Sequence, residues 1–134
     1  YKDKEINTNM AFIDYLWNYW TTKGYQDKAH MRSVKETLAH PGVLAATLGY
    51  YRAMFDVAKA DPALADLRAL MARQIKVPTL ALCGGDDLRA ELMQAQEQYF
   101  DNEYDFKLIA NAGHFLHREQ PQAVTQELLD WLKK

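Results

Sequence analysis

The sequence predicts an α/β protein in which a helical segment precedes a short parallel β-α-β-α segment. Up to about residue 74, apolar residues recur every three or four positions, which is typical of amphipathic helices. After residue 76, two short apolar runs at residues 77–83 and 105–110 flank a further helical pattern. The composition, with 49% hydrophobic and 25% charged residues over 134 positions, is that of a folded domain and excludes a disordered or low-complexity chain.

Four helices are expected in the first segment. The first covers residues 12–20, and the second covers residues 27–38 with Asp27 as its cap. Pro41 lies at the first turn of the third, and the Asp61-Pro62 pair begins the fourth. Their expected buried faces are Phe12, Ile13, Leu16, Trp17 and Trp20; Met31, Val34 and Leu38; Leu44, Leu48, Tyr51, Phe55 and Ala58; and Leu64, Leu67, Leu70 and Met71.

The second segment is expected to hold two parallel strands. Residues 77–83 form a continuous apolar run, which suits a strand buried on both faces, and Gly84 and Gly85 end it. Residues 105–110 form the second strand, near a sheet edge, and Pro121 begins the last helix. The helices of this segment are expected to bury Leu88, Leu92, Ala95 and Tyr99, and Val124, Leu128, Trp131 and Leu132. The crossover between parallel strands is expected to be right-handed.

Two parallel strands do not form a sheet that is stable alone, because their backbone groups need further strand neighbours. We therefore expect that most of the sheet lies outside this chain, or that a second copy supplies it. The chain starts at Tyr1 and its first methionine is Met10, inside an apolar stretch, which favours the first expectation.

The charge balance argues against several classes of partner. Sixteen Lys and Arg stand against 18 Asp and Glu, a net charge of −2, so no nucleic-acid or anionic-membrane partner is expected. No apolar run approaches the roughly 20 residues of a membrane span, and one cysteine cannot form an internal disulfide. A cytoplasmic location follows as the default expectation. No metal-ligand spacing and no nucleotide-binding loop are present, so no metal and no cofactor are expected.

Acidic residues and a histidine follow the two predicted strands. Asp86 and Asp87 come directly after the first strand, and His114 follows the second. Because parallel strands end at the same edge of a sheet, an aspartate and the imidazole can meet there. A carboxylate on one ring nitrogen would fix the tautomer and leave the other nitrogen free as a base. The alternative is that these are ordinary loop acids and a solvated histidine.

These two segments carry a family resemblance. Residues 77–87 (VPTLALCGGDD) and 112–121 (AGHFLHREQP) resemble the carboxyl-terminal part of α/β-hydrolase-fold enzymes. The resemblance implies a helical cap, or lid, in residues 1–74 and the carboxyl-terminal part of the hydrolase core in residues 75–134. It also implies Asp87 as the acid and His114 as the general base of a catalytic triad, with Asp86 the second choice for the acid. His117 is assigned no catalytic role.

The nucleophile of such a triad is missing from this sequence. The family places it upstream, in a Gly-x-Ser-x-Gly type turn, whereas the single serine, Ser33, has no glycine around it. Cys83 lies within an apolar strand, where a cysteine behaves as a small hydrophobe. The resemblance therefore implies the acid and histidine part of a cofactor-independent hydrolase of ester-type substrates, inactive without its nucleophile half.

Aromatic residues are the candidates for substrate binding. Trp17, Trp20, Tyr50, Tyr51 and Phe55 could line an apolar pocket in the cap, with Phe115 beside His114, and would take a small apolar substrate.

Two alternatives to ester hydrolysis stay open. Residues 49–52 (GYYR) are similar to the cap stretch of epoxide hydrolases that places a tyrosine at the epoxide oxygen, here Tyr51. The first alternative is thus an epoxide hydrolase or dehalogenase with an aspartate nucleophile. The second is a non-catalytic fragment that self-associates through its uncovered strand edge.

Overall fold

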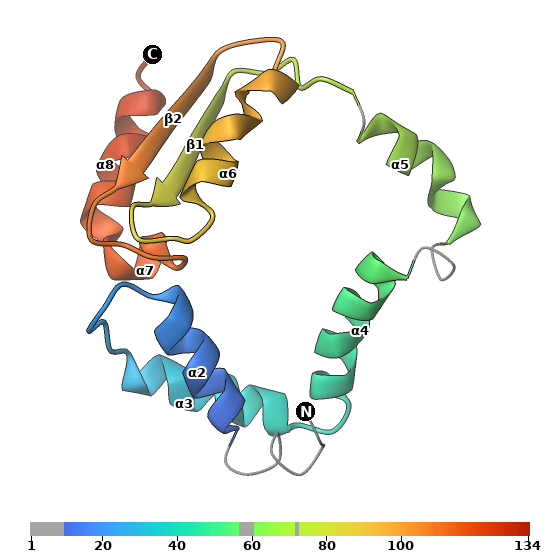
Figure 1. Cartoon of the computed structure of the whole chain (residues 1–134), viewed down its shortest axis with the longest axis vertical. Coiled ribbons are helices and arrows are strands. Elements are labelled where there is room, and N and C mark those ends of the chain that lie inside the picture. The colour runs from blue at the N-terminus through green and yellow to red at the C-terminus, as the bar shows by residue number, and fades with distance from the viewer. Residues whose placement is uncertain (1–9, 57–60, 72) are drawn as a thin grey trace. The chain divides into compact units, whose positions relative to one another are not determined.

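The computed structural model describes residues 10–56, 61–71 and 73–134. The chain divides into two compact units, one formed by residues 27–73 and the other by the residues on either side of them (Figure 1). The helical unit ends at Arg73, one residue before the expected boundary at residue 74. The described residues before 27, however, belong to the same compact unit as residues 74–134. The cap function of residues 1–74 stays a prediction.

The second unit contains the predicted parallel strands. β1 (Thr79–Gly84) pairs in parallel with β2 (Tyr104–Ile109), in a register that aligns Thr79 with Tyr104 and Gly84 with Ile109. The strands start and end within two residues of the predicted ranges. α6 (Ala90–Gln94) and the 3-10 helix η3 (Ala95–Tyr99) lie in the crossover between the strands, and α7 (Leu116–Glu119) and α8 (Pro121–Trp131) follow β2.

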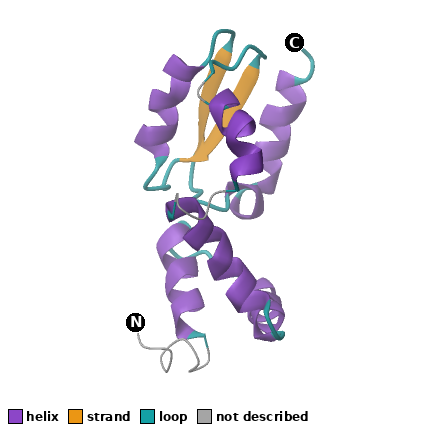
Figure 2. Cartoon of the chain, turned by 90° about the vertical axis from the view of Figure 1, so that its right-hand side faces the viewer, coloured by secondary structure: helices purple, strands orange, loops and turns teal. Residues whose placement is uncertain are grey.

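A small apolar core lies between the sheet and α8, where Ile109, Ala112 and Val124 are buried against Leu82 and Leu116. Figure 1 shows α8 running along β2, and Figure 2 shows helices on both sides of the strands. Burial of a large aliphatic side chain contributes roughly 1.5–3 kcal/mol, so this cluster attaches α8 and fixes the loop that follows β2. The prediction of buried Leu88, Leu92 and Tyr99 in the crossover is wrong, because all three are exposed, as are Leu128 and Leu132 on the last helix.

α2 (Ala11–Trp20) is attached to this unit by aromatic packing and by hydrogen bonds. The buried Trp17 ring stacks on Phe115, with 4.8 Å between the ring centroids. The backbone carbonyl of Trp20 accepts a hydrogen bond of 2.6 Å from the N–H of His114. The carboxyl end of α2 is therefore held against the loop that carries the predicted catalytic histidine.

The helical unit consists of α3 (Lys28–Ala39), α4 (Val43–Phe55), η2 (Pro62–Leu64) and α5 (Ala65–Leu70). The predicted cap of α3 is confirmed, because Asp27 accepts a hydrogen bond of 3.0 Å from the N–H of His30. The prediction that Pro41 lies in the first turn of α4 is wrong. Gly42 adopts a left-handed backbone with φ of 82° and caps the helix, which begins at Val43.

The predicted buried faces of α4 and α5 are also wrong. No residue of either helix is buried, and Phe55 is 80% exposed. Ala58 lies outside the described residues. A periodic apolar pattern identifies one face of a helix but not the element that covers it, and no described residue of this chain buries these faces.

The sheet has two strands within the described ranges, and the outer edge of β1 is paired there with no other strand. Among the described helices, none is long and apolar enough to span a lipid bilayer.

Candidate active site

The turn after β1 positions Asp87. The N–H of Asp87 donates to the carbonyl of Gly84 at 3.1 Å, and the carbonyl of Asp87 accepts from the N–H of Ala90 at 3.0 Å. The carboxylate Oδ1 then accepts a hydrogen bond of 2.9 Å from the backbone N–H of Arg89. The Asp87 side chain is only 7% exposed, so the turn holds it in one orientation.

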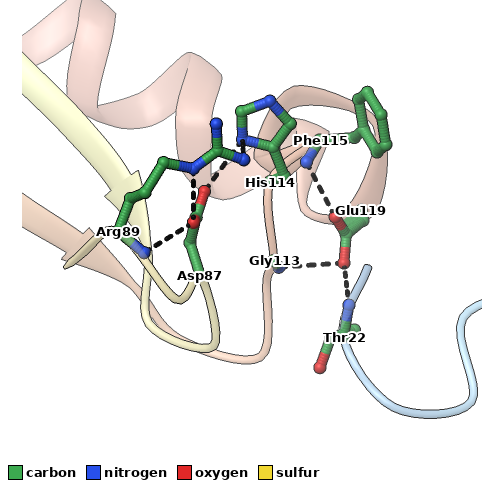
Figure 3. Close-up of polar contacts among 7 residues, drawn as sticks. All are labelled: Thr22, Asp87, Arg89, Gly113, His114, Phe115 and Glu119. Atoms are coloured by element: carbon green, nitrogen blue, oxygen red, sulfur yellow. Dashed lines mark hydrogen bonds and ion pairs between the residues drawn. The ribbon is translucent and has the colours of Figure 1, made fainter. Parts of the chain in front are cut away.

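His114 lies beside this carboxylate. Its Nδ1 is 2.9 Å from Oδ2 of Asp87 (Figure 3). The sequence prediction that the two side chains lie close together, at consecutive strand ends, is confirmed. The imidazole is 37% exposed, and its Nε2 makes no hydrogen bond to the described residues. The arrangement can therefore hold one ring nitrogen on an acid while the other faces outward.

The other candidate acid and the neighbouring histidine do not share this contact. Asp86 Oδ2 accepts a hydrogen bond from the hydroxyl of Thr22. His117 lies on α7 and is exposed. Asp87 is thus the carboxylate that contacts His114.

Arg89 is a member of the site that the sequence analysis missed. Its Nη2 lies 3.0 Å from Nδ1 of His114, and its Nε lies 3.4 Å from Oδ1 of Asp87. The guanidinium also lies 5.7 Å from the centroid of the Trp20 ring, a cation–π distance. Its position two residues after Asp87 was the available signal, because that spacing allows a residue in a tight turn to fold back on the aspartate.

Glu119 is the second residue that the sequence analysis missed. Its carboxylate is buried, with the residue 8% exposed, and it accepts three backbone hydrogen bonds. Oε2 accepts from Gly113 at 2.9 Å and from Thr22 at 2.6 Å, and Oε1 accepts from Phe115 at 3.0 Å (Figure 3). The N–H of His114 donates to the carbonyl of Trp20. The backbone N–H groups of Gly113, His114 and Phe115 therefore all have a hydrogen-bond acceptor.

Two glycines, Gly84 and Gly113, allow the chain segments around the site to approach one another closely. A Cβ at Gly113 would lie 2.4 Å from the carbonyl oxygen of Trp20, and a Cβ at Gly84 would lie 2.1 Å from that of Gly113. The neighbouring atoms belong to the backbone and cannot turn away as side chains can. Glycine at position 84 is therefore required for the Asp87 and His114 loops to meet, and glycine at position 113 is required for the segment after α2 to contact the His114 loop.

The electrostatics favour an ionised Asp87. Burial raises the pKa of the Asp87 carboxyl, but the hydrogen bonds from the Arg89 N–H and from His114, with the charge of Arg89, lower it more. The net pKa lies below the ordinary value of 3.8. Burial, with a smaller contribution from the Asp87 charge, raises the pKa of the Cys83 thiol. A buried and protonated thiol is a poor nucleophile. Ser33 is exposed on α3, in the other compact unit.

The aromatic candidates fall into two groups. Trp20 and Phe115 contact the imidazole of His114, with ring centroids 5.5 and 5.2 Å from it. Trp17 is buried behind Phe115, which leaves little of its ring for a substrate. Tyr50, Tyr51 and Phe55 are exposed on α4, in the helical unit. A substrate-binding role for all of these residues stays a prediction. No cluster of three metal-ligand side chains occurs in the described part of the chain.

Over 95 residues the chain is 32% identical to epoxide hydrolase 3 of Xenopus tropicalis, an alignment that covers 69% of the chain but 23% of that protein. No protein-family model matches the chain.

Solved structures that share its fold include the following two. Cfl2 from Burkholderia cenocepacia superimposes with a TM-score of 0.72 and 26% identity, over 90% of this chain and 40% of Cfl2. The CarC enzyme, a serine hydrolase involved in carbazole degradation, gives a TM-score of 0.65 and 22% identity, over 90% of this chain and 46% of CarC. The chain thus spans less than half the length of each of these three proteins.

Proposed function

We propose that this chain, which has the α/β-hydrolase fold and represents the carboxyl-terminal part of it, supplies the acid and the histidine of a nucleophile–histidine–acid triad for ester-type hydrolysis. The observation that carries the proposal is the Asp87–His114 contact of 2.9 Å. Both residues follow parallel strands at the same sheet edge, where α/β proteins place their sites.

In this proposal, Asp87 holds the proton of His114 on Nδ1 and stabilises the charged ring that forms during catalysis. Nε2 then acts as the base, first toward the nucleophile and later toward water. Asp87 suits this role because its pKa lies below the ordinary value, so it stays ionised near neutral pH. Trp20 and Phe115 would give the site an apolar wall suited to a small apolar acyl substrate.

The nucleophile belongs to the proposed missing part. Neither Ser33 nor Cys83 has the setting of a nucleophile, since Ser33 lies within the helix α3 with no glycine turn around it and Cys83 is buried. The proposed partner is therefore an amino-terminal half that carries the nucleophile turn and the remaining strands. Such a half would also pair with the free edge of β1.

Epoxide hydrolysis is the second candidate. The 32% identity to a protein named epoxide hydrolase 3 favours it. In this version an upstream aspartate attacks the epoxide carbon, Tyr51 donates a hydrogen bond to the epoxide oxygen, and His114 activates the water that releases the product. A dehalogenase would use the same aspartate and histidine.

The test is complementation. The chain is co-expressed with the amino-terminal half of an α/β-hydrolase of matching fold, carrying either a serine or an aspartate in its nucleophile turn. Each pair is assayed with an aryl ester and an aryl epoxide. We expect no turnover by the chain alone, ester hydrolysis with the serine half, and at least about a thousandfold loss in His114→Ala.

If the pair with the aspartate half hydrolyses the epoxide, and the pair with the serine half hydrolyses neither substrate, the second candidate is selected. Hydrolysis by the isolated chain, or hydrolysis by a pair that is unchanged in His114→Ala, would contradict the proposal. His117→Ala is the matched control, because His117 is exposed on α7, outside the Asp87 contact.

A further inference from the structure

Two groups of opposite hydrogen-bonding character approach the same ring nitrogen of His114. Oδ2 of Asp87 lies 2.9 Å from Nδ1, and Nη2 of Arg89 lies 3.0 Å from it. An ionised carboxylate can only accept a hydrogen bond, and a guanidinium can only donate one. A single nitrogen of a neutral imidazole cannot satisfy both, so the position of one proton decides which contact is a hydrogen bond.

The two proton positions have different chemical consequences. When the proton is on Nδ1 it is donated to Asp87, and Nε2 keeps its lone pair and can act as a base. When Nδ1 is bare it accepts from Arg89, and the proton lies on Nε2, which then cannot accept another. Asp87 therefore favours the basic tautomer, and Arg89 favours the tautomer that is inert as a base at Nε2.

The surroundings of Arg89 keep its guanidinium in place for this competition. Nε lies 3.4 Å from Oδ1 of Asp87, and the Trp20 ring lies 5.7 Å from the guanidinium carbon. The side chain is 38% exposed, so it can also leave the ring for solvent. The Asp87 side chain is only 7% exposed and is hydrogen-bonded within its turn, so it cannot move away from the ring in this way.

We propose that Arg89 is a positioning residue that sets the tautomer of His114, holding part of the population with the proton on Nε2 until the guanidinium moves away. The tautomer itself depends only on the contacts above. The effect of this tautomer on catalysis rests on the proposed function. The loss of the Nε2 lone pair slows a reaction only if His114 acts as its base.

The test is nuclear magnetic resonance of the full chain with ¹⁵N-labelled histidine rings, at a pH of about 8.5, well above the ordinary histidine pKa of about 6.5. Shifts and couplings of the ring nitrogens separate protonated from bare nitrogen. We expect Arg89→Met to reduce the fraction with the proton on Nε2 by about three- to tenfold, since a partly exposed charge-assisted hydrogen bond is lost. His30, His40 and His117 are internal references and should not change.

Two further variants make the result decisive. Lys76→Met removes the same charge at the opposite end of β1 and should leave the His114 tautomer as it is. Asp87→Asn removes the carboxylate that favours Nδ1–H and should move the ring toward Nε2–H. The backbone N–H that Arg89 donates to Asp87 survives substitution at position 89, and Arg89→Gln provides a second cation-free variant should Arg89→Met not fold.

An unchanged tautomer ratio in both position-89 variants, a shift in the opposite direction, or an equal shift in Lys76→Met would overturn the proposal. The measurement needs no substrate. A tautomer shift in the chain, with no hydrolysis by either complemented pair, would contradict the proposed function and leave this inference standing. Hydrolysis by a pair, without a tautomer shift in the chain, would do the reverse.

Discussion

The backbone N–H of Thr22 donates a hydrogen bond of 2.6 Å to Oε2 of Glu119, 97 residues further along the chain. The same oxygen accepts from Gly113, and the hydroxyl of Thr22 reaches Asp86. The segment after α2 therefore contacts both loops of the candidate site, the one that holds Asp87 and the one that holds His114. Glu119 acts as the common acceptor that fixes the His114 loop.

Substitution of Glu119 should therefore destabilise the chain. A buried donor that loses its acceptor costs about 1–3 kcal/mol, and Glu119→Ala leaves three N–H groups without theirs. We expect the free energy of unfolding to fall by about 3 kcal/mol or more, measured by urea denaturation. Glu91→Gln, an exposed residue on α6, is the matched control and should change stability by less than about 0.5 kcal/mol. Equal effects of the two substitutions would contradict a structural role for the buried carboxylate.

The close backbone contacts at Gly84 and Gly113 predict that alanine destabilises the chain more at these positions than at Gly85. Gly84→Ala and Gly113→Ala each place a Cβ within 2.5 Å of backbone oxygen, whereas a Cβ at Gly85 would lie 3.4 Å from the nearest atom, the carbonyl oxygen of Ile109. We expect the first two to lose at least about 2 kcal/mol and Gly85→Ala to lose clearly less. Thermal unfolding followed by circular dichroism measures this. A loss in Gly85→Ala that matched the others would show that steric contact is not the cause.

Acid stability should depend on Asp87. Its pKa is lowered in the folded chain, so the unfolded chain binds the proton more readily and stability falls as the pH drops below the ordinary value of 3.8. The stabilisation is fully present above that value and is lost as the pH passes through the lower pKa of the folded chain. We expect Asp87→Asn to flatten the fall in unfolding free energy between pH about 5 and about 2.

The control for this pH dependence is Asp130→Asn. The pKa of Asp130 is also lowered, first by its hydrogen bond from Gln126 and then by Lys133, but the group lies at the surface. Its substitution should alter the profile less, because solvent screens the interaction. A profile that was identical in wild type and Asp87→Asn would contradict the ionised, hydrogen-bonded state of Asp87.

The free edge of β1 predicts association. An unpaired edge is a template for pairing with another chain, and β2 is the one described strand that pairs with β1. We expect the sedimentation coefficient to rise with concentration in the micromolar range. Val77→Lys, which puts a charge on the exposed residue before this strand, should weaken the association, whereas Leu67→Lys in the helical unit should not. A monomer over the whole range would contradict the prediction.

The contact between Asp87 and His114 could be predicted because it depends on local patterns. Each residue follows a short apolar run, and two such runs joined by a helical crossover form a parallel pair whose ends meet at one edge. Strand pairing in register, from Thr79 with Tyr104 to Gly84 with Ile109, then brings the two loops together. The resemblance to the α/β-hydrolases rests on these same segments, which is why fold and pair were predicted together.

The sequence by itself thus determined the parallel strands, the last helix and the acid–histidine pair, since each follows from the order of residues within a short segment. Only the tertiary structure decided the roles of Glu119 and Arg89 and the exposure of α4. The sequence around Glu119 does not indicate that its carboxylate accepts a hydrogen bond from the distant Thr22. Arg89 contacts His114 only because two loops that are separate in the sequence converge. The stripe on α4 likewise defined an apolar face but not its partner. Contacts between distant segments depend on packing in three dimensions, which local periodicity does not encode.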